Sequence, residues 1–301
     1  MISLRDLIEV RPTELLQGTW LPIRMTAVLL LLDGSKVWYV WSMITALTGL
    51  GLVFHTMLRR PAFWLLITLC IATWILRLWP LVDNHHYLAG YWSLAILLAL
   101  CLPDPRASLT VSARWLLALV FLWAALWKGV FSPDFRDGRF FTVQLMSDSR
   151  FEQRAVLLSG LSLEEVRANR SFLMQEKSDA VVDGEEVLPP TITSLNTTPR
   201  FRFWVQVATW SVLAFEASLA LVFLLPLGRW TDPLRHGGLM LFCLGTFAFA
   251  PVWTFGWLLL LLGLAMVPAG REKIRVLYVT VWSLVAFIAY FPWEHLTGLL
   301  V

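Results

Sequence analysis

The sequence predicts an all-α fold, a polytopic transmembrane helical bundle of about 7–8 membrane segments with one hydrophilic loop region. Three observations lead to this prediction. Hydrophobic residues make up 58% of the 301 residues, and the mean hydropathy is +0.68. Charged residues make up only 15%, whereas soluble domains carry about a quarter. Several apolar runs approach the ~20 residues that a helix needs to cross a bilayer.

The predicted membrane segments follow these apolar runs. They cover residues 37–58, 62–81, 84–102, 111–131, 201–227, 236–267 and 275–293. The run 236–267 is interrupted by Pro251, so it forms either one crossing or a bent pair of segments. The shorter run 21–32 contains Arg24 and ends at Asp33-Gly34, which favours an interfacial or buried helix. Tryptophan, with 17 residues, often lies near segment ends, as in interfacial belts.

Four segments describe the organisation of the chain. They are an N-terminal interfacial segment (1–36), a first membrane half (37–131), a hydrophilic excursion (132–200) and a second membrane half (201–301). The excursion has helical spacing of apolar residues at 163–175, with Ser162 and Glu165 placed as a capping box. The part 178–198 contains Pro189-Pro190 and is expected to be irregular. The excursion is either a surface cap or a loop that engages a substrate or a partner protein.

Basic residues in short loops predict the orientation, because cytoplasmic loops carry an excess of lysine and arginine. The residues that mark cytoplasmic loops are Arg59, Arg60, Arg106, Arg114, Arg229 and Arg235. The N-terminus, His85, Lys128 and residues 132–200 are then extracytoplasmic. We expect an integral membrane protein of a bacterial inner membrane, with the lipid bilayer as its first partner.

The most polar stretch within apolar sequence is Asp83-Asn84-His85-His86-Tyr87. Ionisable groups beside hydrocarbon are costly, and they usually mark a pathway, a relay or a catalytic site. Asp83 is near enough to orient or charge one imidazole, and Asn84 can hold a substrate carbonyl. Neighbouring helical residues point about 100° apart, so only one histidine is expected to face a pocket. The pair lacks the i, i+4 spacing and a nearby Cys or Glu, so no metal is predicted.

Lys128 ends another apolar run, residues 116–127, and is the second candidate site. Desolvation of an amine at the end of an apolar helix favours a general base. Two alternatives stay open: the side chain snorkels to the headgroups, or Asp134 or Asp137 pairs with it and keeps it charged. Two ionisable sites at the ends of neighbouring segments indicate one polar pocket that Lys128 shares with the histidines.

Three further ionisable residues accompany these sites. Glu216 lies inside the run 201–227, and His236 opens the next run. Each is either functional or part of a structural pair, for example Glu216 with an arginine. Arg77 is placed to serve an anionic ligand or Asp83. The net charge of +3 is too small to argue for a nucleic-acid partner.

The order of these motifs resembles the vitamin K-dependent gamma-carboxylases and their bacterial relatives, the HTTM proteins. Residues 83–90 (DNHHYLAG) are similar to the family signature Asn-His-x-Tyr-Leu-x-Gly, and Lys128 with Asp134-Phe135 and Gly138 is similar to its Lys, Asp-Trp, Gly element. The resemblance covers residues 37–267 and continues through Glu216, Arg229, His236 and Phe247. The chain departs from the family in a longer Lys-to-Asp spacing, in Phe135 for Trp, and in lacking the C-terminal luminal domain.

The resemblance implies an enzyme that oxidises reduced vitamin K, a naphthohydroquinone, with O₂ to its epoxide. It implies coupling to the addition of CO₂ at a glutamate of a protein or peptide substrate. Lys128 would be the base that activates the hydroquinone, and His85 would assist carboxylation. The predicted substrate- or quinone-binding residues are Asn84, Tyr87, His236 and Arg77, supported by Asp83, Asp134 and Glu216. Two alternatives stay open: a quinone-dependent oxidoreductase without carboxylation, and a non-catalytic scaffold that docks a partner through residues 132–200.

Overall fold

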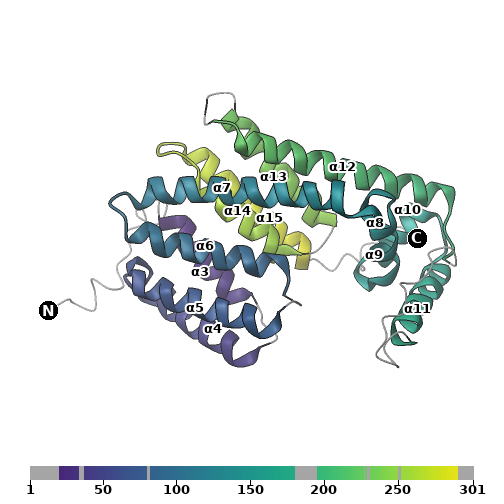
Figure 1. The fold of residues 1–301 in the computed structure, drawn as a ribbon, viewed down its shortest axis with the longest axis horizontal. Helices are drawn as coiled ribbons and strands as arrows, with labels where there is room; N and C mark the ends of the chain where they lie inside the picture. Colours follow the sequence, from purple (N-terminus) through teal and green to yellow (C-terminus); the bar gives the residue numbers. More distant parts are fainter. Residues whose placement is uncertain are drawn as a thin grey trace. The chain divides into compact units, whose positions relative to one another are not determined.

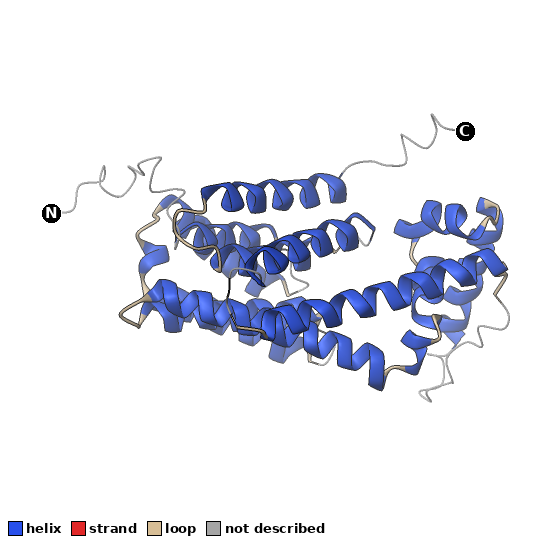
Figure 2. Ribbon diagram, turned by 90° about the horizontal axis from the view of Figure 1, so that it is seen from above, coloured by secondary structure: helices blue, strands red, loops and turns tan. Residues whose placement is uncertain are grey.

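The computed structural model describes residues 20–33, 37–79, 82–179, 195–226, 228, 231–249 and 252–290. Every regular element in these residues is a helix (Figure 2), so the all-α prediction is confirmed. Contacts divide the chain into two compact units. Unit 1 comprises Met1–Val120 and Leu221–Val301, and unit 2 comprises Phe121–Ala220.

Within the described residues, three helices are long and apolar enough to cross a membrane: α5 (Pro61–Leu78), α7 (Pro105–Leu126) with its π-helical extension η2 (Trp127–Phe131), and α12 (Pro199–Leu224). At 1.5 Å per residue, α7 with η2 and α12 are each about 40 Å long, against a hydrocarbon core of ~30 Å. Along α7 and the first residue of η2, every fourth side chain from residue 111 to residue 127 is large, apolar and exposed: Val111, Trp115, Leu119, Trp123 and Trp127. Lipid tails solvate such a stripe and water does not, which indicates a membrane protein.

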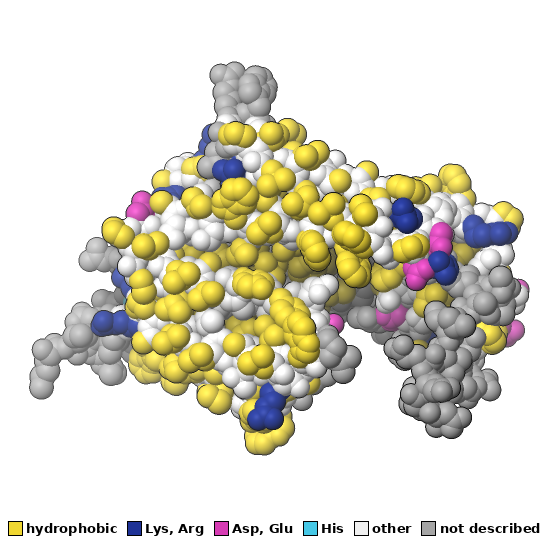
Figure 3. Space-filling view, in the orientation of Figure 1, with side chains coloured by type: hydrophobic (Ala, Val, Ile, Leu, Met, Phe, Trp, Pro, Cys, Tyr) yellow, Lys and Arg dark blue, Asp and Glu magenta, His cyan; other side chains and the backbone are white. Residues whose placement is uncertain are grey.

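Apolar side chains also dominate the face drawn in Figure 3, where the Lys, Arg, Asp and Glu side chains stand in small, separate groups. Helix α5 likewise exposes large apolar side chains, namely Leu65, Leu66, Leu69 and Leu76. A water-soluble surface of this length would carry interspersed charges along each helix. The apolar character of the exposed surface therefore supports the same conclusion as the helix lengths, namely that this is a membrane protein.

Unit 1 contains an antiparallel hairpin of α5 and α6 (Asn84–Leu100) (Figure 1). Ile71 faces Gly90 in the body of the hairpin, and Trp79 meets Tyr87 near its turn. The short helix α3 (Trp20–Leu32) packs against α4 (Trp38–Val53), and its Ile23 and Ala27 are fully buried. The run 21–32 is therefore a buried helix, which was one of the two alternatives that its length left open.

The interrupted run 236–267 forms two helices, α13 (Thr231–Phe249) and α14 (Trp253–Ala265). Leu239 lies against Gly263 and Phe247 lies against Gly256, so the two helices are antiparallel. A Cβ at either glycine would clash with its neighbour, which is why a residue without a side chain stands there. The bent pair is thus the arrangement adopted; Pro251 itself lies outside the described residues. α14 is buried from Gly256 to Ala265, and it contacts α13 and α15 (Glu272–Tyr290).

Two arginines of unit 1 bind the C-terminal end of α12. The carbonyl oxygens that accept their hydrogen bonds belong to Val222, Phe223, Leu224, Leu225 and Pro226. Arg114 of α7 supplies two of these bonds, and Arg235 of α13 supplies three and also pairs with Asp232. The last carbonyls of a helix lack partners within the helix, so the guanidinium groups of buried Arg235 and half-buried Arg114 satisfy them here. Both arginines therefore have a structural role besides the orientation role that the sequence gives them.

The hydrophilic excursion lies in unit 2, and its described part is mostly helical, including the helix that the spacing at 163–175 predicts. It folds into α8 (Pro133–Arg136), α9 (Arg139–Ser147), η3 (Ser149–Phe151), α10 (Glu152–Ser159) and α11 (Leu163–Asp179). The capping box at the start of α11 is confirmed: the Ser162 amide donates to Oε2 of Glu165 at 2.8 Å, and the Glu165 amide donates to Oγ of Ser162 at 3.2 Å. The hydroxyl of Ser162 also donates to Oε2 of Glu165 at 2.9 Å, and the bonds from the Ser162 amide and hydroxyl lower the pKa of the Glu165 carboxyl. Pro189-Pro190 lies outside the described residues.

Glu152 connects α10 to α11. Its Oε1 accepts a hydrogen bond from Nε of Arg167 at 3.0 Å, and its Oε2 accepts one from a terminal nitrogen of Arg170 at 2.5 Å. Burial acts to raise the pKa of this carboxyl, but the hydrogen bonds and charges of the two arginines outweigh burial and lower it. Glu152 is therefore a charged contact whose strength depends on pH.

We expect acid to loosen this contact. Because the pKa of Glu152 is lower in the folded than in the unfolded chain, its stabilisation is present above the ordinary value of 4.5 and is lost as pH falls through the folded value. The melting temperature of the full chain in detergent should fall by a few degrees below pH 4.5. Glu152→Gln should reduce this pH dependence, and Glu164→Gln, on an exposed carboxyl of α11, should not. Equal pH profiles for wild type and E152Q would contradict the assignment.

Candidate functional site

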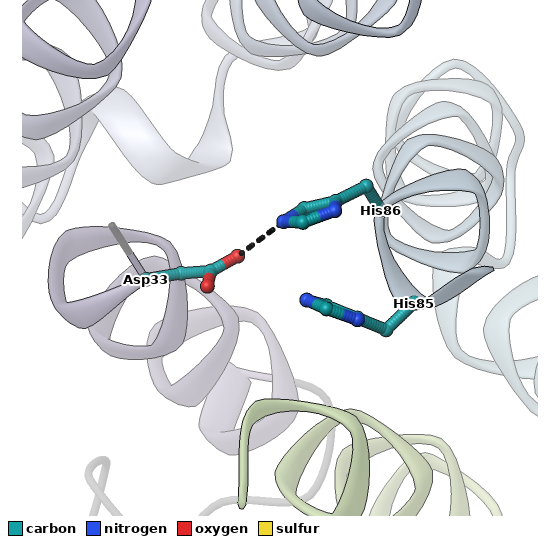
Figure 4. A group of neighbouring side chains, drawn as sticks. All are labelled: Asp33, His85 and His86. Atoms are coloured by element: carbon teal, nitrogen blue, oxygen red, sulfur yellow. Dashed lines mark ion pairs between the residues drawn. The ribbon is translucent and has the colours of Figure 1, made fainter. Parts of the chain in front are cut away.

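Asp33, His85 and His86 lie together in unit 1 and form what we term the histidine cluster (Figure 4). Asp33 directly follows α3, and both histidines lie in the first turn of α6. Nε2 of His86 lies 3.6 Å from Oδ2 of Asp33, and the two imidazole centroids are 3.9 Å apart. One potential ligand atom from each residue lies within 4.8 Å of the other two.

Both imidazoles point toward Asp33, so the expectation that only one histidine faces a pocket is wrong (Figure 4). Their Cβ atoms do diverge around the helix, but rotation about χ1 and χ2 brings the ring ends together. The first turn of a helix permits this, because no preceding turn crowds the side chains. The ring of His86 also lies 4.0 Å from the ring of Trp74, so an indole and an imidazole hold it in place.

The cluster is buried and has few hydrogen bonds. The side chains of His86 and Asp33 are 9% and 11% exposed. Neither ring nitrogen of His86 has a hydrogen-bond partner in the described part of the chain. Burial, followed by the negative charge of Asp83, raises the pKa of Asp33 to about 7. Near neutral pH, Asp33 therefore exists in both its protonated and its ionised form.

The other residues of the polar stretch are more exposed. Asp83 and Asn84 are exposed at the start of α6, and the carbonyl oxygen of Asp83 accepts the amide of His86 at 3.0 Å. The carboxylate 3.6 Å from the His86 imidazole is that of Asp33, and the charge of Asp83 also acts on both histidines, as the sequence predicts. Tyr87 is half-buried with its ring against Trp79, and Arg77 is exposed in the last turn of α5.

Lys128 lies in the π-helical turn η2, a type of irregularity that often occurs at functional sites. Its Nζ donates to Oε1 of Glu216 at 2.5 Å, and it lies 5.2 Å from the centre of the Phe135 ring. The side chains of Lys128 and Glu216 are 26% and 7% exposed. The partner of Lys128 is therefore a carboxylate of α12, and we term the two residues the Lys128–Glu216 pair.

This pairing corrects two expectations from the sequence. Asp134 and Asp137 do not hold Lys128, because both carboxylates bind Arg139 at the surface of unit 2. Glu216 pairs with a lysine, whereas the sequence offered an arginine as its example. The ammonium ion of Lys128 binds a buried carboxylate, which favours the paired alternative over snorkelling to the headgroups. One oxygen of that carboxylate, Oε2, is buried without a hydrogen-bond partner in the described residues.

His236 lies in unit 1 at the start of α13. It is buried, and its Nδ1 lies 2.9 Å from the hydroxyl of Tyr278 on α15. Gly263 of α14 lets the Tyr278 ring approach closely. The hydrogen bond explains how a buried imidazole is satisfied here, and the quinone-binding role of His236 stays a prediction.

The histidine cluster and His236 belong to unit 1, whereas the Lys128–Glu216 pair belongs to unit 2. The single polar pocket that the sequence predicts for His85 and Lys128 therefore stays a prediction. Sequence reasoning missed Asp33 as a site residue. The sequence did contain a signal for it, because Asp33 is an ionisable residue at the end of the short apolar run 21–32. The histidines were identified by the same kind of signal, an ionisable group beside apolar sequence.

Comparison with protein-family models, with curated proteins and with solved structures finds no match to this chain. Functional inference therefore rests on the residues of the two sites. The Lys128–Glu216 pair offers a buried proton acceptor beside a fixed positive charge, and the histidine cluster offers nitrogen and oxygen donors converging on one point.

Proposed function

We propose that this protein is an integral membrane enzyme that oxidises a reduced naphthoquinone with O₂ to the quinone epoxide. The observation that supports the proposal is the Lys128–Glu216 pair at the end of a helix of membrane length, in which one buried carboxylate oxygen has no hydrogen-bond partner among the described residues. A base for a lipophilic hydroquinone must lie next to the bilayer and must have a free acceptor atom. Glu216 lies on a helix long and apolar enough to cross a membrane, and its Oε2 has no hydrogen-bond partner among the described residues.

The ion pair supports Glu216, in place of Lys128, as the base that accepts the proton of the hydroquinone. An ammonium ion has no lone pair, so a paired Lys128 does not accept a proton. In the proposed reaction, the hydroquinone hydroxyl gives its proton to Oε2 of Glu216. The ammonium of Lys128 then stabilises the quinolate oxygen, an interaction that is strong where water is excluded. One hydroquinone and one O₂ give one epoxide and one water, with O₂ as the oxidant.

The proposal includes a bundle of about 7–8 membrane segments in a bacterial inner membrane, with the N-terminus and residues 132–200 extracytoplasmic. The support is the apolar composition and the helix lengths. α3 and α14 have 13 residues each, so at about 20 Å they are too short for a full crossing. The longer helices of unit 1 and α12 then supply the crossings. CO₂ addition to a glutamate substrate is the further step that the family resemblance adds.

The test is epoxide formation by the purified full chain in lipid nanodiscs, with vitamin K hydroquinone and O₂. We expect Glu216→Gln and Lys128→Met each to lower the rate by about 100-fold or more, as for loss of a general base or a charge stabiliser. Glu164→Gln, on exposed α11, should retain the wild-type rate. Absence of epoxide from folded wild-type protein would overturn the proposal. If epoxide forms but labelled CO₂ is not incorporated into a glutamate peptide, the proposed function would be limited to quinol oxidation.

A further inference from the structure

The geometry points to a metal site in unit 1: Asp33, His85 and His86 bind one divalent first-row transition metal ion. The three donors come from the end of α3 and the first turn of α6 (Figure 4). None of them takes part in the Lys128–Glu216 pair, so this inference does not depend on quinol oxidation. It reverses the sequence prediction of no metal, which was made because the spacing was unfavourable and no third ligand was identified beside the histidines.

The distance between His86 and Asp33 is closer to that expected for two ligands of one metal ion than to that of a direct hydrogen bond. Nε2 of His86 lies 3.6 Å from Oδ2 of Asp33, which is too long for a hydrogen bond between an imidazole and a carboxylate. Ligand atoms about 2.1 Å from a tetrahedral ion are about 3.4 Å apart. Because every pair of ligand atoms lies within 4.8 Å, side-chain rotations are enough to complete the site.

The burial of His86 gives a second, independent argument. Its side chain is only 9% exposed, and neither ring nitrogen has a hydrogen-bond partner within the described ranges, although Nε2 lies 3.6 Å from Oδ2 of Asp33. A buried polar atom without a partner costs about 1–3 kcal/mol. A cation between Nε2 and Asp33 would satisfy one nitrogen and also neutralise a carboxylate that burial disfavours as an anion. Trp74 and His85 hold the ring in the orientation that binding requires.

The donor set indicates the class of ion. Two imidazoles and one carboxylate are typical of catalytic zinc sites and of non-haem iron(II) sites, both of which keep a coordination position open. Magnesium and calcium prefer oxygen ligands throughout. Among the described residues, the second ring nitrogen of His86 has no hydrogen-bond partner of the kind that usually strengthens a ligating histidine. We therefore expect an affinity weaker than that of closed structural zinc sites.

The first test measures metal content. The full chain is purified in detergent without a polyhistidine tag, stripped with a chelator, and titrated with Zn²⁺, with Fe²⁺ under anaerobic conditions, and with Mg²⁺. We expect one Zn²⁺ or Fe²⁺ per chain by elemental analysis after desalting, with a raised melting temperature, and no retained Mg²⁺. X-ray absorption of the zinc form should show imidazole nitrogen and oxygen ligands at about 2.0–2.2 Å. Substoichiometric metal, or a shell without imidazole, would overturn the inference.

The second test uses matched variants. Asp33→Asn, His85→Gln and His86→Gln should each weaken Zn²⁺ binding by about tenfold or more. His55→Gln, a histidine in the turn after α4, should bind like wild type. Asp33→Asn has the shape of a neutral carboxyl, so an unchanged melting temperature of its metal-free form separates lost binding from misfolding. Wild-type affinity in all three cluster variants would show that the bound metal lies elsewhere.

Discussion

Replacing Lys128 by methionine is expected to destabilise the folded chain by about 3 kcal/mol, because breaking a buried ion pair leaves one charge without a partner. Glu216 would then be a carboxylate with only 7% of its side chain exposed and no ammonium within reach. Protonation of Glu216 relieves part of this cost, so the loss should be greatest at high pH. Unfolding in mixed detergent, followed by circular dichroism, measures it.

The matched control is the double variant Lys128→Met with Glu216→Leu. Removing both charges leaves no buried ion, so the double variant should recover most of the stability that the single variant loses. Phe135, whose ring lies 5.2 Å from the Lys128 ammonium, also loses a cation–π contact in both variants. Wild-type stability of Lys128→Met alone would contradict a buried pair at this position.

Replacing Arg235 by leucine is expected to destabilise unit 1 by about 3 kcal/mol, since several buried acceptors lose a charged donor at once. Arg235 is 1% exposed and donates to three carbonyl oxygens at the end of α12. Leucine fills part of the volume but cannot donate, so these carbonyls would lie buried without that partner. The melting temperature in detergent measures the effect.

Two further variants serve as comparisons for the stability of Arg235→Leu. Arg114→Leu removes only two bonds from a half-buried side chain, so it should destabilise less than Arg235→Leu. Lys273→Leu, on an exposed position of α15, should change the melting temperature little. If Arg235→Leu melted at the wild-type temperature, the carbonyl contacts would not be a source of stability.

Local sequence patterns predicted several features correctly. Apolar length and composition indicate helices and a membrane, because both depend only on the residues of one segment. The capping box of Ser162 and Glu165 is equally local, since its donors and acceptors are three residues apart. The bent pair in the run 236–267 could be offered only as one of two alternatives, because close contacts at Gly256 and Gly263 decide it.

The site partners, by contrast, needed the tertiary structure. Glu216 lies 88 residues after Lys128, and Asp33 comes from a separate short helix that the sequence did not connect with the histidines. The nearby candidates Asp134 and Asp137 pair with Arg139 instead, because these exposed carboxylates find an arginine on the same surface. Residues close in sequence were therefore the wrong candidates for the partner of Lys128, because the packing of distant segments determines that partner.

The sequence by itself determined that this chain is helical, apolar and membrane-associated, and that His85, His86, Lys128 and Glu216 are ionisable groups in apolar surroundings. Only the tertiary structure decided that Asp33 faces both imidazoles and that Glu216 binds Lys128. The physical reason is that hydrophobicity and helix periodicity are properties of a segment. Compensation of a buried charge depends on which other segment packs beside it, and no local pattern specifies that choice.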